Sequence, residues 1–317
     1  MWKLKCATRL NSFLTRPELF HENESEKLTP MDLVARAGQV KGLTHIDLNF
    51  PDHIQKGQAA KFEKIIDEVG LSLNSLAMRY YKLPQFDEGA LSHPDNAIRQ
   101  AAIDLTLAGI ETLQQMGGNI LTLWLSQEGQ EYAFQVDYSK QYAYLVDSLQ
   151  KIAQSAPEIQ ISIEYKASEP RGISTIGTAA ATLLLINDIS SKNIGVTIDF
   201  CHSLMAGEQP AAAATLVCEK SQLLGIHLND GYGYKDDGLM IGSVHTLHTL
   251  ELLWVLKKYN FQGVIYFDTF ATYQNPVEEC EKNIKMLAQF TEQVESFTQS
   301  QSSLYRYSSW QEWLSKR

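Results

Sequence analysis

Four short apolar runs in the second half of the chain end in residues of the types that can bind metal ions. Each run has the composition of a buried strand, and the polar residues at their ends are Glu164, Asp199, His227 and Asp268. An unpaired buried charge costs several kcal/mol. Three carboxylates gathered at one place would also repel one another and raise at least one pKa, unless a cation neutralises them. Three oxygen ligands and one imidazole suit Mn²⁺, Mg²⁺ or Co²⁺ better than a thiolate-type zinc site, so the pattern predicts a divalent-metal site.

Each of these residues also has an ordinary structural explanation. A carboxylate at the end of a strand often caps the helix that follows it. A single histidine on an apolar strand is often a hydrogen-bonded core residue. The joint occurrence of all four at successive strand ends favours the metal site over these explanations.

A second group of ligand-type residues follows two of the same runs. His202 lies three residues after Asp199, and Asp236 and Asp237 lie in a glycine-rich loop after His227. Aspartate and glycine favour turns in any case, so a solvated turn is the alternative for the loop acids. Two-metal sites place their ions about 3.5–4 Å apart. We interpret the group as a second cation site that shares the Asp199 carboxylate, with the choice between Asp236 and Asp237 open.

The runs that carry these residues alternate with helix-like segments along the chain. Strands are expected at 4–10, 42–50, 71–78, 119–125, 159–165, 194–200, 223–230 and 263–270. Segments 97–118 and 142–156 repeat apolar residues with the spacing of an amphipathic helix. Strand–helix alternation predicts parallel strands with helical crossovers, and eight of them fit a (β/α)8 TIM barrel. A doubly wound open sheet is the alternative, but the Gly-rich phosphate loop that would favour it is absent after the first strand.

A TIM barrel gathers catalytic groups at the mouth formed by the carboxyl ends of its strands. We therefore expect one catalytic barrel over residues 1–290 and a C-terminal helical arm over 291–317. The end of this arm is aromatic, with Tyr305, Tyr307, Trp310 and Trp313. Exposed tryptophans are costly, so we expect the arm to pack on the barrel or on a neighbouring subunit of a homo-oligomer.

Composition excludes several classes of function. The chain has 317 residues, 44% of them hydrophobic, which is typical of a globular protein with a substantial core. A formal net charge of −10 argues against a nucleic acid as the main partner. The four cysteines are scattered and form no disulfide or zinc pattern. The start, MWKLKCATRL, does not resemble a signal peptide, and no apolar run is long enough to span a bilayer, so we expect a soluble cytoplasmic protein without a membrane partner.

Six segments between about residue 70 and residue 270 resemble, in chain order, motifs of the xylose isomerase family. Residues 164–172 resemble its Glu-x-Lys-Pro-x-Glu-Pro-Arg-Gly segment. The matching residues are Glu164, Lys166, Glu169, Pro170 and Arg171. Further matches in other segments fall on Tyr81, Trp124, Glu128, His202 and Asp268.

Two substitutions indicate a divergent member of the family. Asp199 stands where the family's Glu-x-Gly-His segment has glutamate, and His227 stands where its His-Ile-Asp-Leu-Asn-Gly loop has a metal-binding aspartate. These changes are more similar to the rhamnose isomerases and ketose epimerases of the wider superfamily.

The resemblance implies aldose–ketose isomerisation of an open-chain sugar by a hydride shift, with one or two divalent ions, Mn²⁺, Mg²⁺ or Co²⁺. The first ion would act as a Lewis acid on the carbonyl, and water on the second would shuttle the hydroxyl proton. Lys166 would stabilise negative charge developing at O1, unless it only pairs with Glu169. The implied catalytic residues are Glu164, Lys166, Asp199 and His202. The implied substrate contacts are Tyr81, Trp124, Arg171 and Asn229, the two aromatic rings forming a wall against water.

Other activities stay open. A ketose epimerase would abstract a proton through an enediol, with two carboxylates facing each other across the substrate. A non-catalytic sugar-binding barrel would lack the residue that opens the sugar ring. If such a residue is present, His45 and His53 are the candidates for it. An endonuclease acting at abasic sites would need more histidines and a basic face. Arg79, Tyr80 and His53 are candidate substrate contacts, and Arg79 would favour an acidic or phosphorylated sugar.

Overall fold

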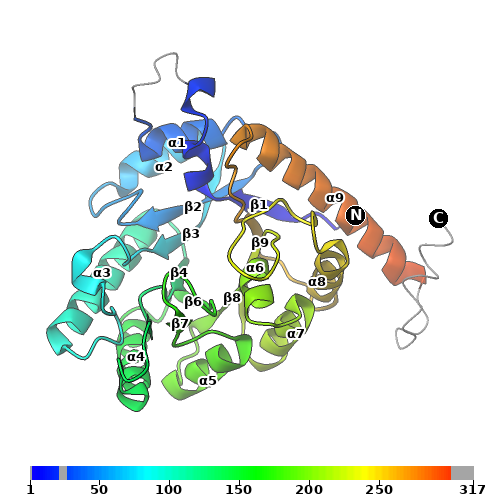
Figure 1. The fold of residues 1–317 in the computed structure, drawn as a ribbon. Coiled ribbons are helices and arrows are strands. Elements are labelled where there is room, and N and C mark those ends of the chain that lie inside the picture. The colour runs from blue at the N-terminus through cyan, green and yellow to red at the C-terminus, as the bar shows by residue number, and fades with distance from the viewer. Residues whose placement is uncertain (1, 21–26, 301–317) are drawn as a thin grey trace.

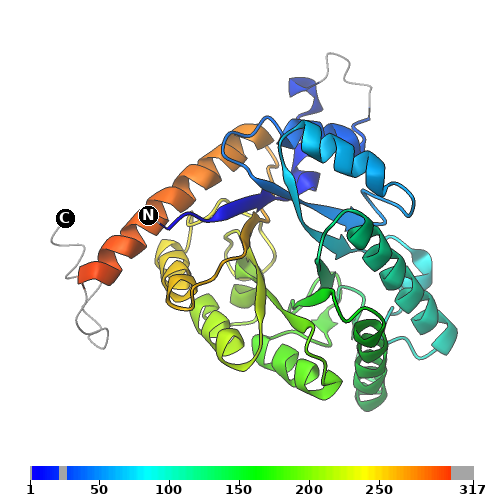
Figure 2. The same ribbon diagram turned by 180° about the vertical axis from the view of Figure 1, so that it is seen from behind.

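Eight parallel strands line the centre of the molecule, and helices surround them (Figures 1 and 2). The structure, a computed structural model, describes residues 2–20 and 27–300. The strands of the central sheet are β1 (Lys5–Thr8), β2 (His45–Phe50), β3 (Ser72–Met78), β4 (Ile120–Trp124), β6 (Gln160–Glu164), β8 (Ile194–Asp199), β9 (Leu223–Leu228) and β10 (Val264–Phe267). Every one of the eight predicted strand runs contains one of them, so the (β/α)8 TIM barrel is confirmed.

The sheet is a nearly closed barrel. Its strand order is β1-β10-β9-β8-β6-β4-β3-β2, with all ladders parallel. At the seam between β1 and β2, the Thr44 N–H donates to the carbonyl of Cys6 at 3.2 Å, and the Cys6 N–H donates to the Thr44 hydroxyl at 3.0 Å. The carboxyl ends of all eight strands therefore meet at one mouth.

The crossover helices cover the outside of this barrel. The α-helices are α1 (Pro30–Ala37), α2 (Ala59–Glu68), α3 (Asn96–Gln115), α4 (Tyr138–Ser155), α5 (Ala179–Ile189), α6 (Phe200–Met205), α7 (Pro210–Lys220), α8 (Thr246–Lys258) and α9 (Pro276–Ser300). Short 3₁₀ helices are η1 (Leu10–Leu14), η2 (Pro17–Leu19) and η3 (Pro84–Phe86). Side-chain caps begin several of the α-helices: Asp95 accepts from the Ala97 N–H at 2.8 Å, and Thr29 forms a capping box with Asp32.

Side chains fill the barrel interior. All six residues of β8 are buried, and the Thr197 hydroxyl lies 2.6 Å from that of Ser162 on β6. Gly225 pairs in register with Thr197, and a Cβ at Gly225 would lie 2.6 Å from the Thr197 hydroxyl oxygen. A larger residue at this position of β9, two residues before His227, would therefore overlap Thr197 unless one of the two strands shifts.

A small antiparallel ribbon joins two loops at the mouth. It pairs β5 (Gly129–Gln130) with β7 (Ile173–Ser174) and was not expected from the sequence. A Cβ at Gly129 would lie 2.3 Å from the Ile173 carbonyl oxygen, so only glycine allows this approach. The ribbon ties the loop after β4 to the loop after β6, above Trp124 and Glu164.

The C-terminal helix α9 packs along the barrel as one continuous element (Figure 1). The boundary predicted between residues 290 and 291 falls inside it. Phe290 and Val294, on either side of that boundary, are both buried. The aromatic end of the predicted arm lies outside the described residues. Within the described part of the chain, no helix combines the length and apolarity needed to cross a membrane.

Candidate metal centre

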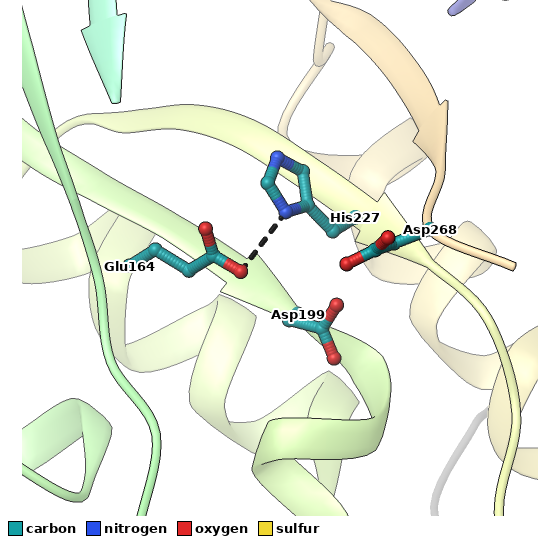
Figure 3. A group of neighbouring side chains, drawn as sticks. All are labelled: Glu164, Asp199, His227 and Asp268. Atoms are coloured by element: carbon teal, nitrogen blue, oxygen red, sulfur yellow. Dashed lines mark hydrogen bonds and ion pairs between the residues drawn. The ribbon is translucent and has the colours of Figure 1, made fainter. Parts of the chain in front are cut away.

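Four side chains from four neighbouring strands converge at the mouth of the barrel. Glu164 ends β6, Asp199 ends β8, His227 lies on β9 and Asp268 directly follows β10. One ligand atom from each lies within 4.8 Å of the ligand atoms of the other three. Figure 3 shows the four groups directed into a common space. This is the set that the strand ends predicted.

The carboxylate of Glu164 is held by imidazoles. Its Oε1 lies 3.1 Å from His227 Nδ1 and 3.5 Å from His202 Nδ1. Burial alone would raise the pKa of Glu164, but His227 and His202 outweigh it and lower the pKa to about 2. Burial would likewise lower the pKa of His227, but Glu164 and the neighbouring carboxylates raise it to about 9. Without a metal ion, the negative charge of the cluster is thus partly balanced by imidazolium.

Asp199 both caps a helix and faces the metal centre. Its Oδ1 accepts from the His202 N–H at 2.9 Å, which begins α6. Asn229 donates from Nδ2 to both carboxylate oxygens, at 3.3 and 3.1 Å, and its own Oδ1 accepts from the Cys201 N–H. Asn229 is fully buried behind Asp199 and does not line the cavity, so the structure places it as a support of the ligand and not as the predicted substrate contact.

The donor set fits a hard divalent cation. Burial and the neighbouring carboxylates raise the pKa of Asp199 to about 7, which is the repulsion expected of clustered acids without a counter-ion. The Oδ1 atom of Asp268 is buried and accepts no hydrogen bond from a described residue, and its cation partner is Arg9 Nε at 3.2 Å. Three carboxylates and one imidazole are the ligand chemistry of Mn²⁺, Mg²⁺ or Co²⁺.

A second group lies beside this cluster. His202 Nε2 lies 3.3 Å from Asp236 Oδ2, and the same oxygen accepts from Lys166 Nζ at 2.9 Å. His202 Nδ1 lies 3.1 Å from the Tyr165 carbonyl oxygen and donates to it in the neutral ring, which leaves Nε2 as the free acceptor. The other Asp236 oxygen is buried without a hydrogen-bond partner among the described residues. These atoms have the arrangement that a second cation, or a proton relay, requires.

The two loop acids of the sequence are separated by the structure. Asp236 lines the cavity with Glu164 and His227. Asp237 turns back into its own loop, where its Oδ2 accepts from the Tyr232 N–H at 2.8 Å and its Oδ1 lies 3.5 Å from Lys235 Nζ. The geometry therefore favours Asp236 over Asp237 as the ligand left undecided by the sequence.

Lys166 is a buried part of the site. Its side chain is 6% exposed and pairs with Asp236 at 2.9 Å and with Glu169 at 3.2 Å. The ion pair with Glu169, which was the alternative to a catalytic role for Lys166, is present. Nζ also lies 5.3 Å from the centre of the Trp124 ring, and both residues line the cavity. Burial would lower the pKa of Lys166, but Asp236 and Glu169 raise it, so the lysine stays charged.

Aromatic rings line part of the cavity above the cluster. Its volume is about 100 Å³, and Tyr81 and Trp124, with ring centres 5.9 Å apart, belong to its lining. Both rings also line an outer pocket of about 500 Å³. Arg171 lines only this outer pocket, where it donates to the carbonyls of Asp87 and Gln127. The predicted substrate contacts Tyr81 and Trp124 thus reach the metal cavity, and Arg171 does not.

Three further candidates of the sequence do not line the cavity. His45 begins β2 at the end of the barrel opposite the mouth, where it contacts Thr44. Tyr80 is fully buried, with its hydroxyl 2.6 Å from that of Thr106. His53 is buried behind Asn11. His45 and Tyr80 therefore cannot touch a sugar in this cavity.

Five cavity residues were missed by the sequence analysis. They are Arg9, Asn11, Asn49, Tyr266 and Phe270. Arg9 and Asn49 lie at the carboxyl ends of β1 and β2. The search for polar residues at strand ends, which was made for the last four predicted strands, would have found both if it had included the first two. Glu128, a match to the family motif, has a structural role: its carboxylate accepts from the N–H groups of residues 90–92.

Comparison with known proteins agrees with this geometry. A profile of the xylose isomerase-like TIM barrel family matches residues 31–290. The xylose isomerase of Thermus thermophilus is 25% identical over 266 residues, which cover 80% of this chain and 68% of that protein. The structure of L-ribulose 3-epimerase has a TM-score of 0.69 at 17% identity, with 96% of this chain and 100% of that chain covered. A D-tagatose 3-epimerase-like protein has a TM-score of 0.66 at 19% identity, with 80% and 90% covered.

These similarities have different weight. The solved structures are too distant in sequence to show more than a common fold. The family profile covers most of the chain, and its match includes all four residues of the metal cluster. The chain therefore belongs to the xylose isomerase-like TIM barrel family.

Proposed function

We propose that the protein is a divalent-metal-dependent aldose–ketose isomerase that acts on an open-chain sugar by a hydride shift. The observation that carries the proposal is that two groups share one cavity. Glu164, His227 and Asp268 of the metal cluster line it together with Lys166, His202 and Asp236. The first group supplies ligands, and the second supplies a fixed positive charge and a proton acceptor.

Glu164, Asp199, His227 and Asp268 would hold the ion. A divalent cation there supplies Lewis-acid polarisation of the sugar oxygens at the two reacting carbons. Asn229 and the α6 N-terminus fix the Asp199 carboxylate, and Arg9 fixes that of Asp268. Such hydrogen-bonded supports behind the ligands orient them for binding.

The remaining cavity residues supply the proton and charge chemistry. Lys166 donates to the substrate oxygen at C1, where negative charge develops. Asp236, next to His202 Nε2, takes the proton of the C2 hydroxyl and later returns it to O1. The C2–H bond breaks with its electron pair, and that hydrogen forms the new bond at C1. Tyr81 and Trp124 exclude water from this transfer.

The test is a metal titration combined with isotope exchange. Protein stripped with EDTA is reloaded with Mn²⁺, Mg²⁺ or Co²⁺ and incubated with a panel of aldoses and ketoses in D₂O. We expect metal-dependent interconversion of at least one aldose–ketose pair, with little deuterium at C1 or C2 of the product. The Lys166→Met variant should lose a factor of about 10²–10³ in kcat. Lys151→Met, which removes an exposed lysine of α4, serves as the matched control.

The same experiment separates the alternatives. Near-complete incorporation of deuterium at a carbon next to the carbonyl would contradict the hydride shift and indicate proton abstraction. If the metal-loaded protein bound sugars but converted none of them, the result would indicate a non-catalytic sugar-binding barrel.

A sugar epimerase is the second candidate, and one observation favours it. Glu164 and Asp268 approach the cluster from different strands, as two acid–base carboxylates on opposite sides of a substrate would. Several solved structures of similar fold are also 3-epimerases. We rank this candidate second because both carboxylates are members of the four-residue metal cluster, and the epimerase has no evident use for Lys166 and Asp236.

A further inference from the structure

Among the described residues that line the metal cavity, one side of the rim carries no carboxylate. The metal cluster occupies the ends of β6, β8, β9 and β10. The opposite side, at the ends of β1, β2 and β3, carries Arg9, Asn49 and Arg79, and no carboxylate of that side lines the cavity. The sheet order places these three strands next to one another (Figure 1). A substrate bound at the metal cluster would therefore extend over a basic surface, which we call the basic arc (Arg9, Asn11, Asn49 and Arg79).

Arg79 is the cation of this arc that has no counter-ion. Its side chain is half-buried, and within the described residues no carboxylate forms an ion pair with it. The only hydrogen bond of its guanidinium there goes to the adjacent Met78 carbonyl, at 3.2 Å. Its second contact is with Trp124, whose ring centre lies 5.6 Å away. Because a guanidinium has five N–H donors, most of its hydrogen-bonding capacity is available to a ligand.

The other cations of the cavity are already engaged. Arg9 pairs with Asp268 at 3.2 Å, and Lys166 pairs with Asp236 at 2.9 Å. Counted together, the three cations that line the cavity face the carboxylates of the lining and that of Asp199 beneath them. The lining carboxylates are Glu164, Asp236 and Asp268. Arg79 is therefore the cation of the lining that forms no ion pair with one of these carboxylates.

The two asparagines of the arc are held in place from behind. His53 Nδ1 accepts from the Asn49 N–H at 3.1 Å, so its Nε2 carries the proton and donates to Asn11 Oδ1 at 2.7 Å. This contact uses the Asn11 carbonyl and leaves its NH₂ group as a donor. The arc thus offers the Asn11 amide donor in addition to the N–H donors of Arg79, and such donors can bind an oxyanion.

We propose that the substrate is a sugar acid, an open-chain sugar whose carboxylate binds Arg79 at the end of the cavity opposite the metal cluster. This inference rests on the proposed sugar chemistry and names its substrate class. A carboxylate on the substrate would supply the counter-ion that Arg79 lacks among the described residues. The planar guanidinium fork of Arg79 matches the two oxygens of a carboxylate, and a phosphate ester is the alternative that the experiment distinguishes.

Calorimetric binding to the Mn²⁺-loaded protein tests this assignment without turnover. The ligands are D-glucuronate and D-galacturonate, their neutral counterparts D-glucose and D-galactose, and D-glucose 6-phosphate. We expect at least one uronate to bind about 10- to 100-fold more tightly than its neutral counterpart, the range of a charge-assisted hydrogen bond. This preference should shrink at high salt, because the interaction is between charges.

Variants identify the residue responsible. Arg79→Gln should abolish the preference for the uronate over its neutral counterpart. Arg79→Lys keeps the charge without the planar fork and should retain part of the preference. Arg16→Gln, which removes an exposed arginine outside the cavity, should behave like the natural protein. Thermal melting confirms that each variant is folded before it is titrated.

The outcomes are distinct from those of the proposed function. Equal affinity for uronates and neutral sugars, a preference that survives Arg79→Gln, or no binding of either uronate overturns the assignment. Tighter binding of the phosphate ester overturns the carboxylate as the recognised group. A uronate that binds through Arg79 but is never isomerised or epimerised leaves the binding assignment standing and refutes the proposed chemistry.

Discussion

A single carboxylate, that of Asp199, begins a helix and faces the metal cluster at the same time. Its Oδ1 accepts the His202 N–H and an Asn229 amide hydrogen, yet the group still lies among the four ligand atoms. Capping and ligation are compatible because a carboxylate has about four acceptor positions. The lone pairs of Asp199 that accept no hydrogen bond therefore decide whether this carboxylate can also bind a metal ion.

Removing one ligand tests the cluster at the scale of the residue. Asp268→Asn should weaken Mn²⁺ binding by at least about 10- to 100-fold, the range found when even a group behind a metal ligand is removed. Asp237→Asn should leave the affinity close to that of the natural protein, because Asp237 is engaged in its own loop. Calorimetric Mn²⁺ titrations of both variants check this, and equal losses would mean that both acids bind the ion.

The histidines predict how the metal-free protein responds to pH. Burial would lower the pKa values of His202 and His227, but the nearby carboxylates raise both from the ordinary 6.5 to about 9. A folded-state pKa above the unfolded value stabilises the fold at low pH. This contribution is fully present below pH 6.5 and is lost as the pH rises to about 9.

Thermal melting in EDTA measures this effect. The melting temperature of the metal-free protein should fall between about pH 6.5 and about pH 9, and the His202→Gln/His227→Gln double variant should not show this fall. Mn²⁺ binding near neutral pH should release protons, because ligand imidazoles must be neutral. Calorimetry in buffers of different ionisation enthalpy detects the release, and its absence would exclude both histidines as protonated groups.

At the scale of the element, the site depends on how β8 and β9 approach each other. Thr197 pairs in register with Gly225, and Asp199 pairs with His227 two residues later. The two ligands are therefore set by the same ladder that the glycine makes possible. A shift of β9 away from β8 would move His227 away from the cluster.

Gly225→Ala tests this coupling. Its Cβ would lie 2.6 Å from the Thr197 hydroxyl, and such overpacking costs about 1–3 kcal/mol of unfolding free energy. We also expect weaker Mn²⁺ binding. Gly207→Ala is the matched control: its φ of +70° makes alanine unfavourable there by about 1–2 kcal/mol, but no atom lies within 4 Å of the added Cβ. Urea denaturation and Mn²⁺ titration should show destabilisation in both variants and lost affinity only in the first.

At the scale of the whole molecule, α9 crosses the predicted domain boundary and packs on the barrel. Phe290 is buried, and a Cβ at Gly242 would lie 2.6 Å from its ring, so this helix packs closely on the loop that precedes α8. The loop between β9 and α8 also carries Asp236. Packing of the helix therefore supports a wall of the site from outside.

Truncation of the buried ring tests this packing. Phe290→Ala should lower the free energy of unfolding by about 3–5 kcal/mol, the usual cost of removing a buried aromatic side chain. Gln289→Ala, on the exposed side of the same helix, should change it by no more than about 0.5 kcal/mol. Chemical denaturation compares the two, and a small effect of Phe290→Ala would mean that the helix is dispensable for the fold.

The amino-acid sequence by itself determined the fold class and the four polar residues that meet at the mouth of the barrel. Strand and helix periodicity is local, so all eight strands were predicted from short windows. Glu164, Asp199, His227 and Asp268 were found for the same reason, since parallel strands that end in polar residues deliver them to one mouth.

Only the tertiary structure decided which polar groups remain free. Asp236 and Asp237 are adjacent in sequence, and their loop turns one into the cavity and the other into its own hydrogen bonds. Asn229 lies behind a ligand, and His45 lies at the far end of the barrel. The sequence offered Arg79 only as one of several candidate contacts, because an arginine becomes a binding group only when folding brings it into a cavity and leaves it without a carboxylate partner.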